Sequence, residues 1–157
     1  MNTQATDQGP ALSSVADIEA LADQLSNNAD ELHKRVMAEI RRHQGGPVSE
    51  ADKSLARALL EDEVLLRQRA NGLYADAATY VVKSLATSQA QVMQLTADAA
   101  EKIRKISRIA DVASLVGGLL TLAGAAATGQ AAPIIVAIER VSKQIKKIDA
   151  SAPNKAA

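Results

Sequence analysis

Apolar side chains recur every three or four positions along most of this 157-residue chain. That spacing is typical of amphipathic helices that pack along a seam. It predicts a first helix from about Ser14 to Gln44, with Ser14 as its N-cap. The seam of this helix consists of Val15, Ile18, Ala22, Leu25, Ala29, Leu32, Val36 and Ile40. Three helix-breaking residues then predict a chain reversal: Gly45, Gly46 and Pro47.

A second helical pattern begins at Ser49, with Asp52 three residues later as its capping partner. The pattern continues to Arg108, and the next proline is Pro133. An unbroken helix over 49–108 would extend about 90 Å at 1.5 Å per residue, about twice the length of the first helix. Gly72 is therefore the expected position of a bend or break.

Residues 112–138 contain no charged side chain and are interrupted by several glycines. A chain reversal is expected at Gly129, and Pro133 is expected to start a last helix. The apolar side chains that we expect to contact protein or lipid are Val112, Leu115, Val116, Leu119, Leu120, Leu122, Ile134, Ile135 and Ile138. An apolar stripe continues along the last helix through Val141, Ile145 and Ile148.

Composition agrees with a helical fold, because the chain has 32 alanines, two tyrosines and no Phe or Trp. Alanine is the best helix former and lets helices approach closely. We therefore expect an all-α protein with one domain at 14–150, an elongated antiparallel bundle of three or four long helices with coiled-coil-like packing. In this arrangement the long helix lies between the first helix and the C-terminal helix. Residues 1–13 and 151–157 are expected to be disordered tails.

The zero net charge hides an uneven distribution of charge. Residues 1–100 carry 9 basic and 14 acidic side chains, whereas residues 101–157 carry 9 basic and 4 acidic ones. Two basic clusters flank the apolar segment: Lys102, Arg104, Lys105 and Arg108 before it, and Arg140, Lys143, Lys146 and Lys147 after it. An acidic front and a basic rear favour association, within one chain or between chains.

Catalytic and metal-binding patterns are missing from the sequence. His33 and His43 lie ten residues apart, an offset that places them on different faces of one helix. The acidic run at 61–63 points in three directions on a helix, and there is no Cys and no phosphate-binding glycine loop. We therefore expect a non-enzymatic protein with no cofactor, no metal and no small-molecule substrate. A nucleic-acid partner is not expected either, because the net charge is zero and the basic clusters lack aromatic side chains.

Two interpretations of residues 112–138 stay open. As one continuous helix the segment is long enough to cross a bilayer, but a hairpin turning near Gly129 would have arms too short to cross. A hairpin would place both basic clusters on one side, where an anionic membrane could hold them. Alternatively, the segment is permanently buried in the core of a soluble cytoplasmic scaffold or adaptor. The expected partners are a second copy, another helical protein or an anionic membrane.

The layout of long helices with one apolar segment near a chain reversal resembles that of soluble bacterial helical pore-formers of the cytolysin-A type. It is also similar to that of hydrophobic translocators of contact-dependent secretion. The resemblance covers architecture alone and implies a membrane-associated, self-associating protein. The N-terminus has neither a basic region nor an apolar region of the Sec type, so the expected location is the cytoplasm or export by another route.

Overall fold

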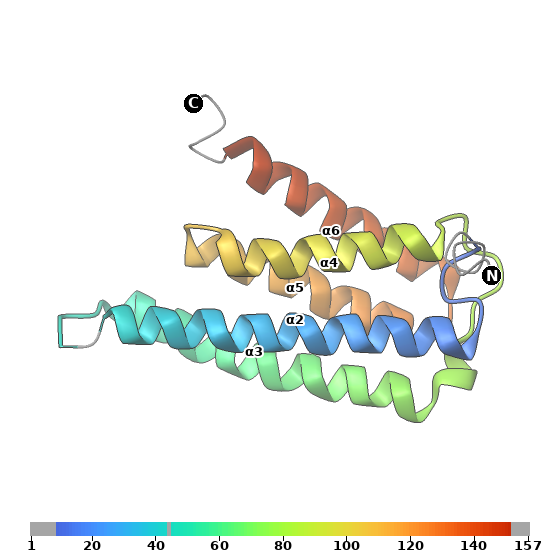
Figure 1. Ribbon diagram of the computed structural model, residues 1–157, viewed down its shortest axis with the longest axis horizontal. Coiled ribbons are helices and arrows are strands. Elements are labelled where there is room, and N and C mark those ends of the chain that lie inside the picture. The colour runs from blue at the N-terminus through green and yellow to red at the C-terminus, as the bar shows by residue number, and fades with distance from the viewer. Residues whose placement is uncertain (1–8, 44, 152–157) are drawn as a thin grey trace, which may run out of the picture.

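The computed structural model describes residues 9–43 and 45–151, and most of this part of the chain is helical. Its elements are α2 (Val15–Arg42), α3 (Glu50–Ala75), the 3₁₀ helix η1 (Ala77–Tyr80), α4 (Gln89–Lys105), α5 (Ile109–Ala126) and α6 (Ala131–Ser151). Each α-helix runs antiparallel to the one before it (Figure 1). The predicted all-α class is confirmed. The predicted count of three or four helices is not, because the described residues form five α-helices.

The first hairpin forms where local sequence signals predict it. The Ser14 hydroxyl accepts a hydrogen bond from the Asp17 N–H at 3.1 Å, and the Ser49 hydroxyl accepts one from the Asp52 N–H at 3.1 Å. Each bond satisfies an N–H group that the first turn of the helix leaves free. Between the helices, Gly45 takes a φ of +82°, which glycine adopts without strain. Gln44 lies outside the described residues.

The predicted long helix is broken into α3 and α4, and the break does not lie at Gly72. Gly72 is an ordinary position inside α3, and the helix ends at Ala75. A new helix starts at Gln89, where Ser88 and Gln91 form a reciprocal capping box. Consequently α4 folds back along α2, and no single long helix lies between the first and last helices. A further break at 106–108 separates α4 from α5.

The end of the predicted N-terminal tail is packed against the bundle, which corrects the expectation of disorder for residues 9–13. The Ala11 N–H donates to the Thr87 carbonyl and the Val82 N–H donates to the Leu12 carbonyl, both at 2.8 Å. Ala11 and Leu12 are fully buried, and Leu12 adopts a left-handed φ of 59°. This strap closes one end of the bundle over the segment that joins η1 to α4. The rest of the predicted tails, 1–8 and 152–157, lies outside the described residues.

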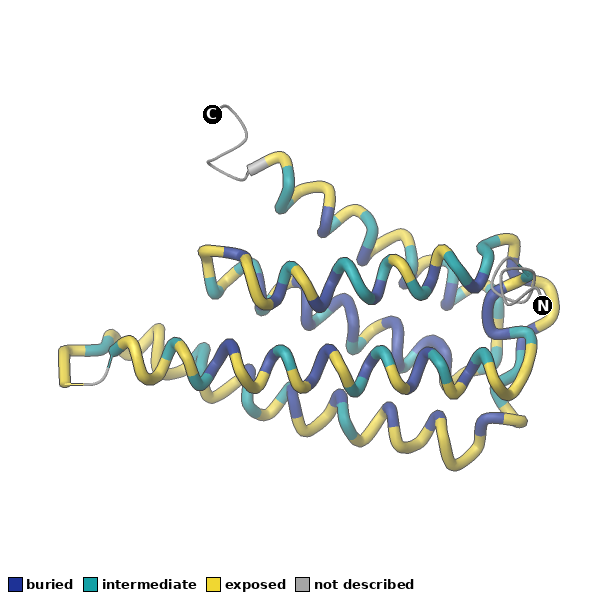
Figure 2. Tube along the Cα trace, viewed as in Figure 1, coloured by how far each residue is buried: buried dark blue, intermediate teal, exposed yellow. Residues whose placement is uncertain are grey.

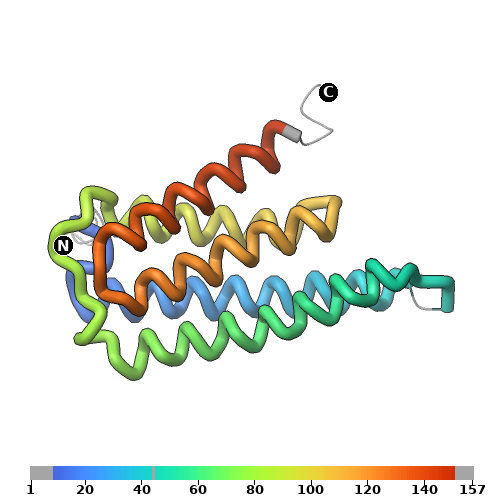
Figure 3. The backbone as a smooth tube through the Cα atoms, turned by 180° about the vertical axis from the view of Figure 1, so that it is seen from behind, coloured from blue at the N-terminus to red at the C-terminus, as the bar shows by residue number. Residues whose placement is uncertain are grey.

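The core lies between α2, α3, α4 and α5, while α6 packs on the outside of α5 and α4. Figure 2 shows the buried residues along the inner sides of the helices and exposed residues at the tip of the α2–α3 hairpin. Seen from behind in Figure 3, α6 leaves the bundle progressively toward its C-terminus. Gly129, at a φ of +65°, makes the predicted reversal between α5 and α6, and Pro133 lies in the first turn of α6.

Candidate binding surfaces at the open end of the bundle

The predicted apolar segment is mainly core. Six of its candidate side chains have no exposed surface: Val112, Leu115, Val116, Leu119, Leu122 and Ile134. The other three, Leu120, Ile135 and Ile138, are partly buried against the same cluster. Within the described residues, α5 is the one helix that is long and apolar enough to cross a bilayer, and half of it is buried. The core helix of a soluble protein has these same properties, so length and composition alone do not decide between the two roles.

The glycines of α5 accommodate close neighbours. A Cβ atom at Gly118 would overlap Gln144 Oε1 and lie 3.2 Å from Val141 Cγ2, so α6 approaches α5 closely at this point. On the outer face of α5, a Cβ atom at Gly124 would lie 3.2 Å from the Arg69 guanidinium. Arg140 of α6 donates a hydrogen bond at 2.9 Å to the hydroxyl of Thr121, which also lies on α5. Polar ends of long side chains therefore cover the small residues of α5 that face outward.

The two predicted basic clusters mostly meet at one end of the bundle. Helices α4 and α6 both end on the side where the α2–α3 hairpin has its tip (Figures 1 and 3). The Lys102 ammonium forms an ion pair with the Asp149 carboxylate, which joins the two helix ends directly. Arg140 is the exception among the predicted flanking residues, because it lies nearer the start of α6 and bonds to α5.

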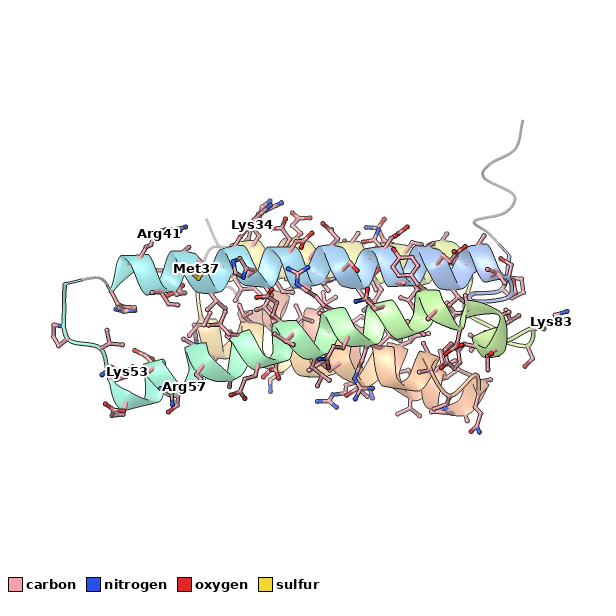
Figure 4. The ribbon with its side chains drawn as sticks, turned by 90° about the horizontal axis from the view of Figure 1, so that it is seen from below. Lys34, Met37, Arg41, Lys53, Arg57 and Lys83 are labelled. Carbon is pink, nitrogen blue, oxygen red and sulfur yellow. The ribbon has the colours of Figure 1, made fainter. Side chains whose placement is uncertain are left out.

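An apolar groove lies at the same end of the bundle and was not predicted. The α2–α3 hairpin extends beyond the connection between α4 and α5, so its tip has no covering helix (Figure 4). The resulting groove has a volume of about 810 Å³. Its apolar lining is Val36, Met37, Ile40, Val48, Ala56, Leu60 and Ile109.

The loss of cover is visible along the α2 seam itself. Ile18, Leu25 and Leu32 have no exposed surface, and Val36 is 1% exposed. The next residue of the seam, Ile40, is 43% exposed. Full burial of an exposed aliphatic side chain of this size contributes about 1.5–3 kcal/mol, and less than half of that gain remains for Ile40. The uncovered seam is therefore a surface on which a partner would be stabilised.

Cationic side chains surround the groove. Arg41, Lys53 and Arg57 line it together with His43, and the opposing carboxylates are Glu39 and Asp52. Figure 4 shows Arg41 on the side of α2 that faces away from Lys53 and Arg57 on α3. Glu39 is already engaged by Arg35 at 3.1 Å and by Arg42 at 2.5 Å.

Arg41 and Arg57 form no ion pair within the part of the chain that the structure describes. Their guanidinium groups, one on each helix of the groove, are available for an acidic ligand.

Arg35, next to the groove-lining Val36, joins α2 to the end of α4. Its guanidinium is buried and donates to the Ile103 carbonyl at 3.0 Å and to the Ser107 carbonyl at 3.4 Å. These carbonyls belong to the end of α4 and to the turn that leads into α5, and Ser107 itself lines the groove. Arg35 thus fixes the point at which the cover provided by α4 and α5 stops.

Polar groups elsewhere in the described residues join helices to one another. His33 Nδ1 lies 2.8 Å from Glu63 Oε1, and Arg67 joins the other Glu63 oxygen to Asp30. Glu63 is therefore a buried partner of α2 and not part of a solvated acidic run. Burial, with a smaller contribution from Glu61, raises the pKa of its neighbour Asp62. No cluster of three potential metal ligands exists among the described residues.

The apolar seam of α2 continues almost to the end of that helix, where the groove lies. Ile40 belongs to the same seam as Leu32, although it lies only three residues before His43 and the end of the helix. An apolar seam that continues to the end of a helix is fully covered only by a partner helix of equal length. Because one long helix was predicted over 49–108, the shortness of α4 was not expected.

Comparisons with models of protein families, with curated proteins and with solved structures found no match to this chain.

Proposed function

We propose that this protein is a non-catalytic adaptor that forms complexes by accepting a short amphipathic helix of another protein in the groove at the open end of the bundle. The observation that carries the proposal is the abrupt loss of burial along the α2 seam, from 1% exposure at Val36 to 43% at Ile40. Hydrophobic grooves between helices are a common docking site for amphipathic helices.

The shape of the groove supports a helix as the occupant. Further along the bundle, α4 and α5 cover the inner face of the α2–α3 hairpin. A helix docked beyond Ser107 would continue that cover and form a three-helix packing with α2 and α3. The stretch of α3 before its first fully buried residue, from Glu50 to Ala58, extends about 12 Å at 1.5 Å per residue, which corresponds to about two turns of a partner helix.

The charges around the groove support an acidic partner. Arg41 and Arg57 would face carboxylates on a docked helix, and Arg binds carboxylates through two parallel hydrogen bonds. A second copy is disfavoured, because two open ends that met would bring their cationic side chains together. The opposite end carries the acidic residues Asp17, Glu19 and Asp23. There the strap at residues 9–12 packs on the segment between η1 and α4, while Val15 of the α2 seam is 43% exposed.

The test uses a fluorescein-labelled helical peptide of about twelve residues, with leucines on one face and glutamates on the other, and measures its anisotropy. Ile40→Asp places a charge in the groove and is expected to weaken binding at least tenfold, which corresponds to about 1.4 kcal/mol. Val64→Asp is the matched control, because Val64 is 54% exposed on α3 and does not line the groove. A matched peptide with lysines in place of the glutamates should bind at least about tenfold more weakly.

Two results would contradict the proposal. The first is equal binding of the acidic peptide by Ile40→Asp and by the unchanged protein. The second is no binding of this peptide at about 1 mM, a concentration at which even an interaction of about 4 kcal/mol is measurable.

A second candidate function is latent membrane insertion by α5. The observation that favours it is that α5, Ile109–Ala126, is long and apolar enough to cross a bilayer and has Asp111 as its one charged residue. In the soluble form α5 would be stored between α3, α4 and α6. The two functions predict different effects of a charge introduced on the buried face of α5. If α5 is only a core helix, the protein should fail to fold; if α5 inserts into a bilayer, the protein should fold but lose lipid binding.

A further inference from the structure

Helix α6 loses its cover toward its C-terminus. Along its apolar stripe, Ile134, Ala137 and Val141 have no exposed surface, whereas Ile145 is 8% exposed and Ile148 is only partly buried. The helix packs closely on α5 around Gly118 and then departs from the bundle (Figure 3). Its C-terminal half is joined to α4 by the ion pair between Lys102 and Asp149. The aliphatic stripe therefore ends at a boundary between protein and solvent.

The other faces of this half of α6 are strongly basic. Lys143, Lys146 and Lys147 are exposed and form no ion pair with any described carboxylate. The end of α4 adds further cations: Lys102, Arg104, Lys105 and Arg108. The carboxylates on these two stretches, Glu101 and Asp149, are each engaged by a lysine of α4. We name the seven cationic residues, together with Ile148, the α4–α6 basic surface.

We propose that the α4–α6 basic surface docks this protein on an anionic membrane, with the lysines of α6 among the lipid headgroups and Ile148 at the boundary with the acyl chains. A helix with lysines on its polar side and aliphatic residues on the other is typical of segments that lie in a membrane interface. Anionic headgroups attract such lysines within about 10 Å at moderate salt. The inference does not rest on the groove, which lies mainly between α2 and α3 and shares with this region only the turn at Ser107 and Ile109.

A membrane accounts for this surface better than a nucleic acid does. One partly exposed aliphatic side chain, Ile148, lies next to the lysines, and a lipid interface accepts both, whereas a phosphate backbone offers nothing to isoleucine. The aromatic residues of the chain are Tyr74 and Tyr80, on α3 and η1, so the surface has no ring on which a base would stack. Both basic helix ends also face the same side of the bundle, which suits a planar partner.

The experiment measures binding to vesicles of phosphatidylcholine with and without phosphatidylserine, by flotation and by fluorescence. The chain has no Trp, so Ile148→Trp introduces a single reporter at the predicted point of contact. We expect a blue shift of its emission with the anionic vesicles and none with the neutral ones. Val64→Trp, on the exposed side of α3, should show no shift.

A charge-matched pair of triple variants tests the location of the contact. K143Q/K146Q/K147Q removes three cations from α6 and should weaken binding to anionic vesicles at least tenfold at about 0.1 M salt. K34Q/K53Q/K83Q removes three exposed cations from α2, α3 and the connection before α4 (Figure 4), and should weaken binding less than about threefold. Each replaced lysine is exposed, and circular dichroism verifies that both variants remain folded.

Several outcomes would overturn the inference. Equal loss in the two triple variants would show that net charge alone governs binding. A shift at Val64→Trp equal to that at Ile148→Trp would show that the bundle opens on the vesicle. Competition by duplex DNA at an equal concentration of phosphate would assign the surface to nucleic acid. Ile40→Asp, in contrast, should bind vesicles as the unchanged protein does, because Ile40 lies in the groove and not on the α4–α6 basic surface.

Discussion

Replacement of Arg35 tests whether the open end of the bundle is built as the contacts indicate. The side chain is 9% exposed and reaches from α2 to two backbone carbonyls, those of Ile103 and Ser107. Its Nε also donates to Glu39 at 3.1 Å. The carbonyls at the end of a helix have no partner within the helix, so Arg35 supplies hydrogen bonds that α4 cannot make for itself.

The magnitude follows from the contacts that would be lost. A hydrogen bond to a charged group contributes about 1.5–3 kcal/mol, and the bond to Ser107, at 3.4 Å, is at the weak end of this range. Arg35→Met removes both carbonyl bonds but preserves most of the aliphatic stem. Glu39 keeps its second partner, Arg42. We expect the free energy of unfolding to fall by about 2–4 kcal/mol, a large part of the 5–15 kcal/mol typical of a domain.

Urea denaturation followed by circular dichroism measures this loss. Arg42→Met is the control: its side chain is 65% exposed and pairs only with Glu39, so its replacement should cost less than about 1 kcal/mol. Hydrogen exchange should be accelerated in Arg35→Met at the end of α4. The groove would also lose its inner boundary, so binding of the acidic peptide should weaken together with stability. A loss below about 1 kcal/mol for Arg35→Met would refute the role that we assign to this residue.

The remaining predictions concern α5 and are measured by the same denaturation assay. Gly117→Ala should stabilise the protein by about 0.5–1 kcal/mol, because the added methyl group meets only ordinary contacts. Gly118→Ala should be at least about 1 kcal/mol less stable than Gly117→Ala, because its methyl group displaces Gln144. Equal stabilities of the two variants would show that α6 does not approach α5 closely. Leu119→Asp should abolish the cooperative transition, since it removes a fully buried side chain and introduces a charge, while Thr121→Asp on the exposed face should not. A folded Leu119→Asp that has lost only vesicle binding would instead support membrane insertion by α5.

The elements that the sequence predicted well are those with local causes. Ser14 and Ser49 cap their helices through bonds to residues three positions later, and such bonds depend on a few neighbouring residues. The reversals at Gly45 and Gly129 depend on left-handed backbone conformations that glycine adopts easily. The periodic burial of α2 and α6 follows from the spacing of aliphatic residues. Fold class and most helix boundaries in these regions were therefore accessible from the sequence.

The break between α3 and α4 has a non-local cause and was not predicted. Neither glycine nor proline lies between Leu73 and Ser88, and Gly72 is tolerated inside α3. The segment is held out of helical conformation by the strap, because Val82 and Thr87 bond to residues about 70 positions or more earlier in the chain. A buried Gln89 side chain adds a bond to the Leu12 N–H. The capping box at Ser88 was the one local signal, and it was missed.

The groove could not be predicted from the sequence for the same reason. It exists because α4 and α5 meet before the tip of the α2–α3 hairpin is reached (Figure 4). On the sequence, Ile40 and Leu32 are equivalent members of one seam. Only the turn between α4 and α5, placed by Arg35, makes the first exposed and the second buried. The two ends of the bundle are consequently different. At one end the strap packs on the segment between η1 and α4, whereas at the other the α2–α3 hairpin extends beyond α4 and α5 (Figure 1).

This difference between the ends has a physical consequence for association. Closing the open end with the protein's own chain would require α4 to be about two turns longer, which would bury Ile40 and remove the groove. Without that cover, Ile40 keeps an unfavourable contact with water that a partner helix can relieve, and Arg41 and Arg57 beside the groove have no ion-pair partner among the described residues. The free energy left unused in folding thus becomes available for binding. An extended α4 that raised stability and at the same time abolished binding of the acidic peptide would demonstrate this exchange directly.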